Sequence, residues 1–296
     1  MTSTVSLKRA LRERVRGGRE ALNVLWANRS ARAGLVILIF YVLLVTVGPL
    51  IVPPPKVNPA QAFLPPSLKH PLGTDWVGED ILAEIVHGGG FVIGVSLIAG
   101  LFSIGLGVII GLLAGYSDGL LSKALMGATD IALTIPGFIF TLVLVSFVKT
   151  SNPFVLAGIL SVLGWAGFAR AVRSQVLSIR NQPFVEAARV LGFRTGHILF
   201  REVFPNVISY TAIHYVFQVQ GALLATVGLY FLGVLPYNAS NWGVMLNQSQ
   251  SIGAFYNVKA ISYFLSPLAA VTGFALGLVL ITFGLDEIFN PRLRTS

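Results

Sequence analysis

The chain contains no cysteine among its 296 residues, which excludes disulfide bonds, iron–sulfur clusters and thiol catalysis. It also lacks any Gly-Lys pair, and with it the G-x-x-x-x-G-K-S/T loop that holds the phosphates of ATP. The H-E-x-x-H pattern of zinc metalloproteases does not occur either. The four histidines stand far apart, without the spacing of metal ligands: His70, His87, His197 and His214. We therefore expect no catalytic residue, no metal site and no cofactor in this chain.

Charged residues are scarce, at 11% of the chain, whereas a typical soluble domain has roughly a quarter. Hydrophobic residues make up 54%, and long runs contain no Asp, Glu, Lys or Arg. A membrane-spanning helix needs about 20 mostly apolar residues. The runs predict an all-α integral membrane protein with six transmembrane helices, at Ala33–Val52, Gly88–Ser117, Ile131–Val148, Thr150–Ala169, Val207–Val234 and Ala260–Leu285.

The net charge of +9 comes from basic residues that collect on one side of the six predicted spans. With the N-terminus inside, 17 Lys and Arg residues face the cytoplasm and four face outward, namely Lys56, Lys69, Lys149 and Lys259. Because cytoplasmic loops are enriched in Lys and Arg, we expect a multi-pass protein of the cell membrane with both termini cytoplasmic. The basic surplus then reflects topology and lipid headgroups, and nucleic acid is not an expected partner.

This topology divides the chain into a basic cytoplasmic arm (1–32), a six-span membrane domain (33–290) and a cytoplasmic tail (291–296). Three connecting segments are long enough to carry functional residues: an external linker (53–87), a cytoplasmic loop (179–205) and an outer loop (236–259). Within the linker, Trp76–His87 places apolar residues at helical spacing opposite Glu79, Asp80 and Glu84. We expect a short amphipathic helix there, lying on the membrane surface.

Small and polar residues inside the spans indicate which helix faces meet. Gly107, Gly111 and Gly115 recur every four residues, and Gly273 and Gly277 do the same in the last span. Because lipid tails are as apolar as leucine, helices in a membrane associate through such small-residue faces. We expect close packing between helices of this chain at both places.

The fifth span carries the polar face that points to a pathway. His214, Gln218, Gly221 and Ala225 share one side of a helix. Polar side chains are costly against lipid, so this face should meet a cavity or another helix. A translocation path and an interhelical hydrogen bond are the two interpretations. Asp130 is expected near the cytoplasmic boundary rather than in a proton relay.

The loop between the fourth and fifth spans contains a charged stretch, QPFVEAARVLGFRTGHILFREVFPN, that has the features of a docking element. Pro183 suits the first turn of a helix and Gly192 its end, while Glu186 favours the positive end of the helix dipole. Ala187 and Ala188 would form a slim surface that enters a groove of a partner. Three arginines, Arg189, Arg194 and Arg201, could pair with carboxylates at the rim of that groove.

The run EAARVLG, followed by EVFPN, resembles the EAA motif of permease subunits of ABC importers. Glu186, Ala187, Ala188, Gly192 and Pro205 match that motif position by position, with Phe204 where leucine is usual. Four other stretches, HPLGTDWVGED, LLAGYSDG, GWAGFARAVRSQVLS and NPRLR, resemble the second permease (C-type) subunit of dipeptide and oligopeptide importers. Several motifs in the same order make the resemblance specific over nearly the whole chain.

The resemblance implies the fold of a type I ABC importer permease, with a cytoplasmic coupling helix that docks on an ATP-hydrolysing subunit through Glu186–Gly192 and Arg194. It implies a complex with a second homologous permease, two ATP-binding subunits that hold ATP and Mg, an external substrate-binding protein and membrane lipid. The path would include His214, Gln218, Thr226 and Tyr230.

The chain departs from the family pattern at several positions. Glu79 stands where arginine is usual, Thr226 where glutamate is usual and Tyr230 where serine is usual. Further departures are Gly88-Gly89-Gly90 for G-A-R, Gly127 for arginine and Asn290 for aspartate. These changes leave the expected architecture intact and bear on the substrate.

Two questions about the substrate and its entry follow. Peptides are expected from the resemblance, but amide and hydroxyl groups in the fifth span would also suit neutral oligosaccharides, and relatives carry metal complexes as well. The outer loop, with Asn247 and Gln250, is expected to form part of the outer gate.

The rival classes are an ion-coupled secondary transporter using Asp130 and His214, and a membrane anchor without a pathway.

Overall fold

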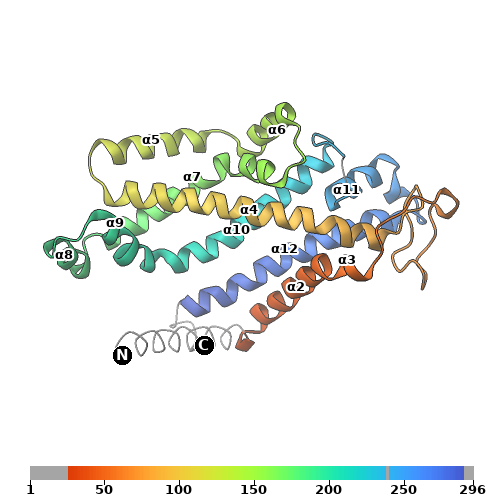
Figure 1. Ribbon diagram of the computed structural model, residues 1–296, viewed down its shortest axis with the longest axis horizontal. Coiled ribbons are helices and arrows are strands. Elements are labelled where there is room, and N and C mark those ends of the chain that lie inside the picture. Colours follow the sequence, from red (N-terminus) through yellow and green to blue (C-terminus); the bar gives the residue numbers. More distant parts are fainter. Residues whose placement is uncertain (1–25, 238–239, 290–296) are drawn as a thin grey trace, which may run out of the picture.

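The computed structural model describes residues 26–237 and 240–289, and helices are the regular elements of this part of the chain (Figure 1). The α-helices are α2 (Arg29–Thr46), α3 (Gly48–Ile51), α4 (Ile81–Tyr116), α5 (Leu120–Thr134), α6 (Gly137–Val148), α7 (Pro153–Ile179), α8 (Pro183–Val190), α9 (Thr195–His197), α10 (Phe204–Phe231), α11 (Trp242–Ser251) and α12 (Ile261–Phe289). The short elements are η1 (Pro59–Gln61), η2 (Ile198–Val203) and η3 (Ala254–Tyr256). Most of the predicted arm (1–32) and the predicted tail (291–296) lie outside the described residues.

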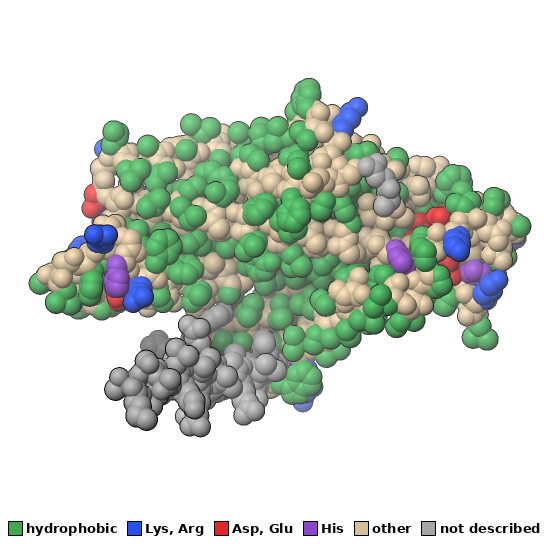
Figure 2. Space-filling model, in the orientation of Figure 1, with side chains coloured by type: hydrophobic (Ala, Val, Ile, Leu, Met, Phe, Trp, Pro, Cys, Tyr) green, Lys and Arg blue, Asp and Glu red, His purple; other side chains and the backbone are tan. Residues whose placement is uncertain are grey.

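The long helices form a bundle in which α4 runs through the middle, with α7 and α10 along it and α2 paired with α12 (Figure 1). The segment with α8 and α9 lies at one end of the bundle. The linker between α3 and α4, together with α11, lies at the opposite end. Large apolar side chains cover the flank between the two ends, where lipid would surround the protein (Figure 2).

Helices α4 and α7 touch along the glycine face predicted from the sequence. A Cβ atom added at Gly111 would lie 2.6 Å from Cβ of Val172, and one added at Gly115 would lie 2.6 Å from Cβ of Val176. At Gly107 it would lie 2.7 Å from Cδ1 of Phe168. These distances leave no room for a side chain, because the backbone of α4 itself is in van der Waals contact with α7. The expected packing role of this face is confirmed.

The second glycine pair lies where α12 packs on α2. Gly273 and Gly277 of α12 face Tyr41 and Ile37 of α2, and an added Cβ at Gly277 would lie 2.8 Å from Cγ2 of Ile37. In the reverse direction, an added Cβ at Gly34 would lie 2.7 Å from the backbone nitrogen of Ile281. Thus the glycines of each helix make room for the partner helix: side chains of α2 fill the space above Gly273 and Gly277, and the backbone of α12 lies against Gly34.

Five helices are long and apolar enough to cross a membrane, and a sixth span exists if the bent pair of α5 and α6 counts as one. The expectation of a single third helix over Ile131–Val148 is wrong, because the chain turns by 83° between α5 and α6. Pro136 explains the break. Proline disfavours the α conformation in the residue before it, and Ile135 accordingly adopts φ −84° and ψ 125°.

The expectation of a separate surface helix over Trp76–His87 is also wrong. Asp80 caps α4 by accepting a hydrogen bond from the backbone nitrogen of Ala83, so the helix begins at Ile81 and continues without a break to Tyr116. Glu84 is not on a solvent-facing side but only 1% exposed. Periodicity alone could not separate these first turns from the long apolar run that follows them.

The glycine contact between α4 and α7 leads to a test of stability. Gly111→Val should lower the thermal unfolding midpoint of the purified chain by several degrees, because overpacking a tight contact costs about 1–3 kcal/mol. Gly105→Val is the matched control, since Gly105 lies on the same helix and an added Cβ there meets nothing within 4 Å. Equal midpoints for the two variants would show that the α4–α7 contact does not limit stability.

Candidate functional site

The predicted docking helix is present as α8, and its ends follow the residues that predicted them. Pro183 occupies the first turn, where its missing N–H costs no hydrogen bond. Glu186 lies in the same turn, at the positive end of the helix dipole. Gln182 precedes the helix in an extended conformation, with φ −75° and ψ 148°.

The C-terminal end of α8 is closed by a Schellman motif centred on glycine. The N–H of Gly192 donates to the carbonyl of Arg189 at 2.9 Å, and the N–H of Phe193 donates to that of Ala188 at 3.2 Å. Gly192 has φ +76°, a left-handed conformation that other residues adopt at a cost. Gly192 therefore sets where α8 stops and where the chain turns back.

Helix α8 presents one face to the bundle and the other to the surroundings. Val185 is fully buried and Ala188 is 5% exposed, in a cluster with Ile198, Leu199 and Val203. Glu186 and Ala187 are exposed. The expectation that both alanines face a partner is therefore wrong for Ala188, which packs inside the chain because it lies three residues after Val185 on the inner side of the helix.

The exposed tip of this end is apolar with basic residues beside it. Val190 and Leu191 are 88% and 73% exposed, and Arg194 is exposed next to them. Arg189 is instead held by the chain itself. Its Nε donates to the hydroxyl of Tyr116 at 3.1 Å, and its guanidinium lies 5.0 Å from the centre of the Tyr116 ring. This contact links α8 to the last residue of α4.

The chain returns to the bundle through a π-helical turn, η2 (Ile198–Val203), which leads into α10. Pro205 lies in the first turn of α10, where its ring is tolerated, and it cannot donate the hydrogen bond that a continuous α-helix would require there. The inner side of η2, with Ile198 and Val203 buried, packs on α8. As a result α8, η2 and α10 form one packed unit.

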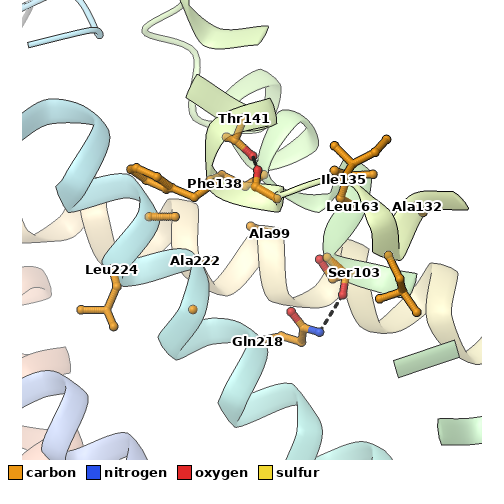
Figure 3. A pocket seen from close by; sticks show the side chains of 16 residues that line it. Ala99, Ser103, Ala132, Ile135, Phe138, Thr141, Leu163, Gln218, Ala222 and Leu224 are labelled. Atoms are coloured by element: carbon orange, nitrogen blue, oxygen red, sulfur yellow. Dashed lines mark hydrogen bonds between the residues drawn. The ribbon is translucent and has the colours of Figure 1, made fainter. Parts of the chain in front are cut away.

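A cavity of about 550 Å³ lies between α4, α5, α6, α7 and α10 (Figure 3). Most of its wall is apolar, and its polar side chains are neutral: Ser103, Thr141 and Gln218. Gln218 donates from Nε2 to the carbonyl of Gly164 at 2.8 Å, which holds its amide at the wall. Gly221 and Ala225, on the same face of α10, also line the cavity.

The predicted path residues divide into those that line this cavity and those that do not. Gln218 lines it, whereas His214 packs among aromatic rings, with its centroid 4.2 Å from that of Tyr210 and 5.1 Å from that of Phe168. Thr226 is fully buried and donates to the carbonyl of Ala222 at 2.7 Å. Tyr230 is 3% exposed and packs edge-on against Phe91. His214, Thr226 and Tyr230 therefore do not line this cavity, and their place on a translocation path stays a prediction.

Sequence reasoning did not identify the cavity residues contributed by other helices. Ser103 comes from α4, and Phe138 and Thr141 come from α6, beyond the bend at Pro136. Pro136, inside an apolar run, was the available signal, because an internal proline predicts a break in the helix. The segment after such a break can turn and line a cavity. Asp130 lies outside the cavity and pairs with Arg170 of α7.

The predicted outer loop folds back onto the bundle around α11. Trp242 is fully buried and donates from Nε1 to the carbonyl of Ile85 at 3.0 Å, so its ring is enclosed by the protein against α4. Asn247 donates from Nδ2 to the carbonyl of Phe231 at 2.6 Å and accepts from the hydroxyl of Tyr237 at 2.7 Å. Asn247 thus holds the loop, while Gln250 is exposed and free to meet a partner.

Comparison with known proteins agrees with this arrangement. Residues 107–295 match the family described as binding-protein-dependent transport system inner membrane component. Residues 18–66 match the N-terminal transmembrane domain of oligopeptide transport permease C. The first match includes α8, most of the cavity and α12.

Relatives extend over nearly the whole chain. A putative peptide permease protein of Brucella suis is 33% identical over 272 residues, covering 91% of this chain and 89% of the relative. The dipeptide transport system permease protein DppC of Bacillus subtilis is 29% identical, covering 90% and 83%. The oligopeptide transport system permease protein OppC of Haemophilus influenzae is 32% identical, covering 74% and 72%. The chain therefore belongs to the inner membrane components of binding-protein-dependent transport systems, in the C-type branch of the ABC permeases.

Proposed function

We propose that the chain is the C-type permease subunit of an ATP-driven importer that carries dipeptides and oligopeptides. Three relatives from different bacteria are named for peptides, and two of them are permeases of dipeptide or oligopeptide systems. This agreement among relatives carries the proposal and disfavours the oligosaccharide alternative. The cavity wall, with neutral polar groups from Ser103, Thr141 and Gln218, suits the passage of varied substrates. Selection would then belong to an external binding protein.

The orientation follows from the charges at the two ends of the bundle. The end of the bundle with α8 carries basic residues from the start of α5, the end of α7 and the segment from α8 to η2, which supports a cytoplasmic position for that end (Figure 1): Lys123, Arg180, Arg189, Arg194 and Arg201. The linker between α3 and α4 and the outer loop then face outward, where the external binding protein would dock, with Gln250 at the gate. Both termini would be cytoplasmic.

Coupling to ATP would run through α8. Two ATP-binding subunits would hold ATP and Mg, and one of them would receive the exposed face of α8 and its tip, with Glu186, Ala187, Gly192 and Arg194. The inner face transmits movement, because Val185 and Ala188 pack against η2 and so against α10. Arg189 passes the same movement to α4 through Tyr116. Since α4 and α10 line the cavity, tilting α8 would change its shape and give alternating access together with the second permease.

The docking role predicts the effect of a bulky residue on the exposed face of α8. Ala187→Trp should reduce peptide uptake and the stimulation of ATP hydrolysis by loaded binding protein about tenfold or more, because a side chain that does not fit an interface costs about 1–3 kcal/mol. Uptake into proteoliposomes and ATP hydrolysis by the complete transporter are the measurements. Ala124→Trp, an exposed alanine of α5 outside the docking segment, is the control. Stimulation at the control level in the Ala187→Trp transporter would refute docking through this face.

The cavity predicts the effect of narrowing it. Gly221→Phe should lower uptake about tenfold without loss of the assembled complex, because an added Cβ at Gly221 meets nothing within 4 Å and the ring would fill the cavity. Gly105→Phe is the matched control, since Gly105 is equally open and does not line the cavity. Unchanged uptake in Gly221→Phe would place the pathway elsewhere.

The substrate class can be tested on the external binding protein that works with this chain. A mixture of short peptides should raise its thermal unfolding midpoint by several degrees, because a ligand that binds only the folded state stabilises it. A mixture of oligosaccharides should leave the midpoint unchanged. Stabilisation by the sugars and not by the peptides would overturn the peptide assignment while leaving the permease role in place.

A further inference from the structure

Three carboxylates meet at the end of the bundle opposite α8. Asp75 and Glu79 belong to the turn that closes the linker, and Glu84 lies in the first turn of α4. One carboxylate oxygen from each of the three lies within 4.8 Å of the others. The cap at Asp80 produces this meeting, because it starts α4 immediately after the turn that holds the first two.

Two of these carboxylates are buried, and basic side chains do not neutralise them. Asp75 and Glu84 are each 1% exposed. Within residues 26–237 and 240–289, no Lys, Arg or His side chain forms an ion pair with any of the three. His70, the nearby basic group, lies 2.7 Å from Asp80, which is not part of the cluster.

The side chain of Glu84 adds an observation that the cluster alone does not supply. Its Oε1 accepts a hydrogen bond from the hydroxyl of Ser240 at 2.7 Å. Its Oε2 is buried and has no hydrogen-bond partner among the described residues. A buried carboxylate oxygen without a donor is rare, because it loses its water without compensation. The oxygen belongs to the carboxylate that completes the cluster, where a positive ligand would satisfy it.

The turn itself is built to hold its carboxylates in place. Asp75 Oδ1 accepts from the backbone nitrogens of Val77 and Glu79, at 3.0 and 2.7 Å. Like charges this close in a poorly solvated site require either a proton or a cation between them.

We propose that Asp75, Glu79 and Glu84 bind one calcium ion. All three ligands are carboxylate oxygens. Hard cations such as calcium favour oxygen ligands, whereas softer transition metals favour nitrogen and sulfur. Calcium–oxygen distances are about 2.3–2.6 Å, so two oxygens on opposite sides of one ion are at most about 5 Å apart. The observed limit of 4.8 Å fits that span. Magnesium binds at shorter distances of about 2.0–2.1 Å in a stricter octahedral geometry and usually keeps several waters, so a site built of three protein carboxylates favours calcium.

A bound ion would join the end of the linker to the start of α4 and, through Glu84, would hold a third segment that is distant in the sequence. Asp75 and Glu79 come from the linker, Glu84 from α4, and Ser240, on Glu84, from the segment before α11. Through these residues the ion would fix the linker and the outer loop on the start of α4. The surface that it stabilises is the one where the external binding protein would dock.

The test uses the full-length chain purified in detergent and treated with a chelator. Calcium at about 1 mM should raise the thermal unfolding midpoint by roughly 5 °C, and equilibrium binding of radioactive calcium should approach one ion per chain. Glu84→Gln and Glu79→Gln should each abolish the shift and the binding. Glu79→Gln is the milder variant because Glu79 is only partly buried, so it remains informative if Glu84→Gln does not fold.

Asp80→Asn is the matched control. It removes one negative charge beside the cluster, while asparagine can keep the helix cap, so the response to calcium should persist. Absence of a calcium-dependent shift in the unmodified chain overturns the proposal, as does a shift that survives in Glu79→Gln. The thermal unfolding midpoint could also rise on acidification in the presence of chelator and not respond to calcium. That result would show that the carboxylates share a proton, and it would overturn the proposal. A response to magnesium alone would also overturn the calcium assignment.

Discussion

The close contact of α4 with α7 is the interaction on which the rest of the structure depends. At 36 residues, α4 is about 54 Å long, so it reaches from one end of the bundle to the other. Its first turn carries Glu84, its middle contributes Ser103 to the cavity, and its last residue, Tyr116, holds Arg189 of α8. Because glycines bring α7 against its backbone, α4 can act as a rigid connection between these three places.

The membrane helices could be predicted from the sequence because lipid imposes a simple rule. A chain that crosses hydrocarbon must be apolar over a fixed length and satisfy its backbone internally, so the runs without charge mark the spans. Their ends were less predictable. The fourth span was predicted to end at Ala169, before Arg170, whereas helix α7 continues to Ile179. A charged residue limits the apolar run but does not end the helix, because the helix can extend beyond the hydrocarbon. The glycine spacing of α4 predicted a tight contact but not that α7 was the partner.

The functional residues show the same division. The start and end of α8 follow from Pro183, Glu186 and Gly192, which act locally. Which side of α8 turns inward depends on η2, a contact that spacing within α8 does not encode, and so Ala188 was assigned to the wrong face. The burial of Thr226 depends in the same way on neighbouring helices. Local chemistry could be predicted, and contacts between helices could not.

The bend at Ile135 and Pro136 has a consequence for hydration. Helices α5 and α6 have 15 and 12 residues, so each is at most about 22 Å long and falls short of the roughly 30 Å hydrocarbon core. The last carbonyl groups of α5 lack backbone donors within the helix. The hydroxyl of Thr134 donates to the carbonyl of Ile131 at 2.7 Å, and the others would remain unsatisfied if they faced lipid. Broken backbone at this depth is tolerated where it is covered by protein or lines water. Ala132, Leu133 and Ile135 line the cavity, so the proline that breaks the helix places the freed backbone groups where water inside the protein can reach them.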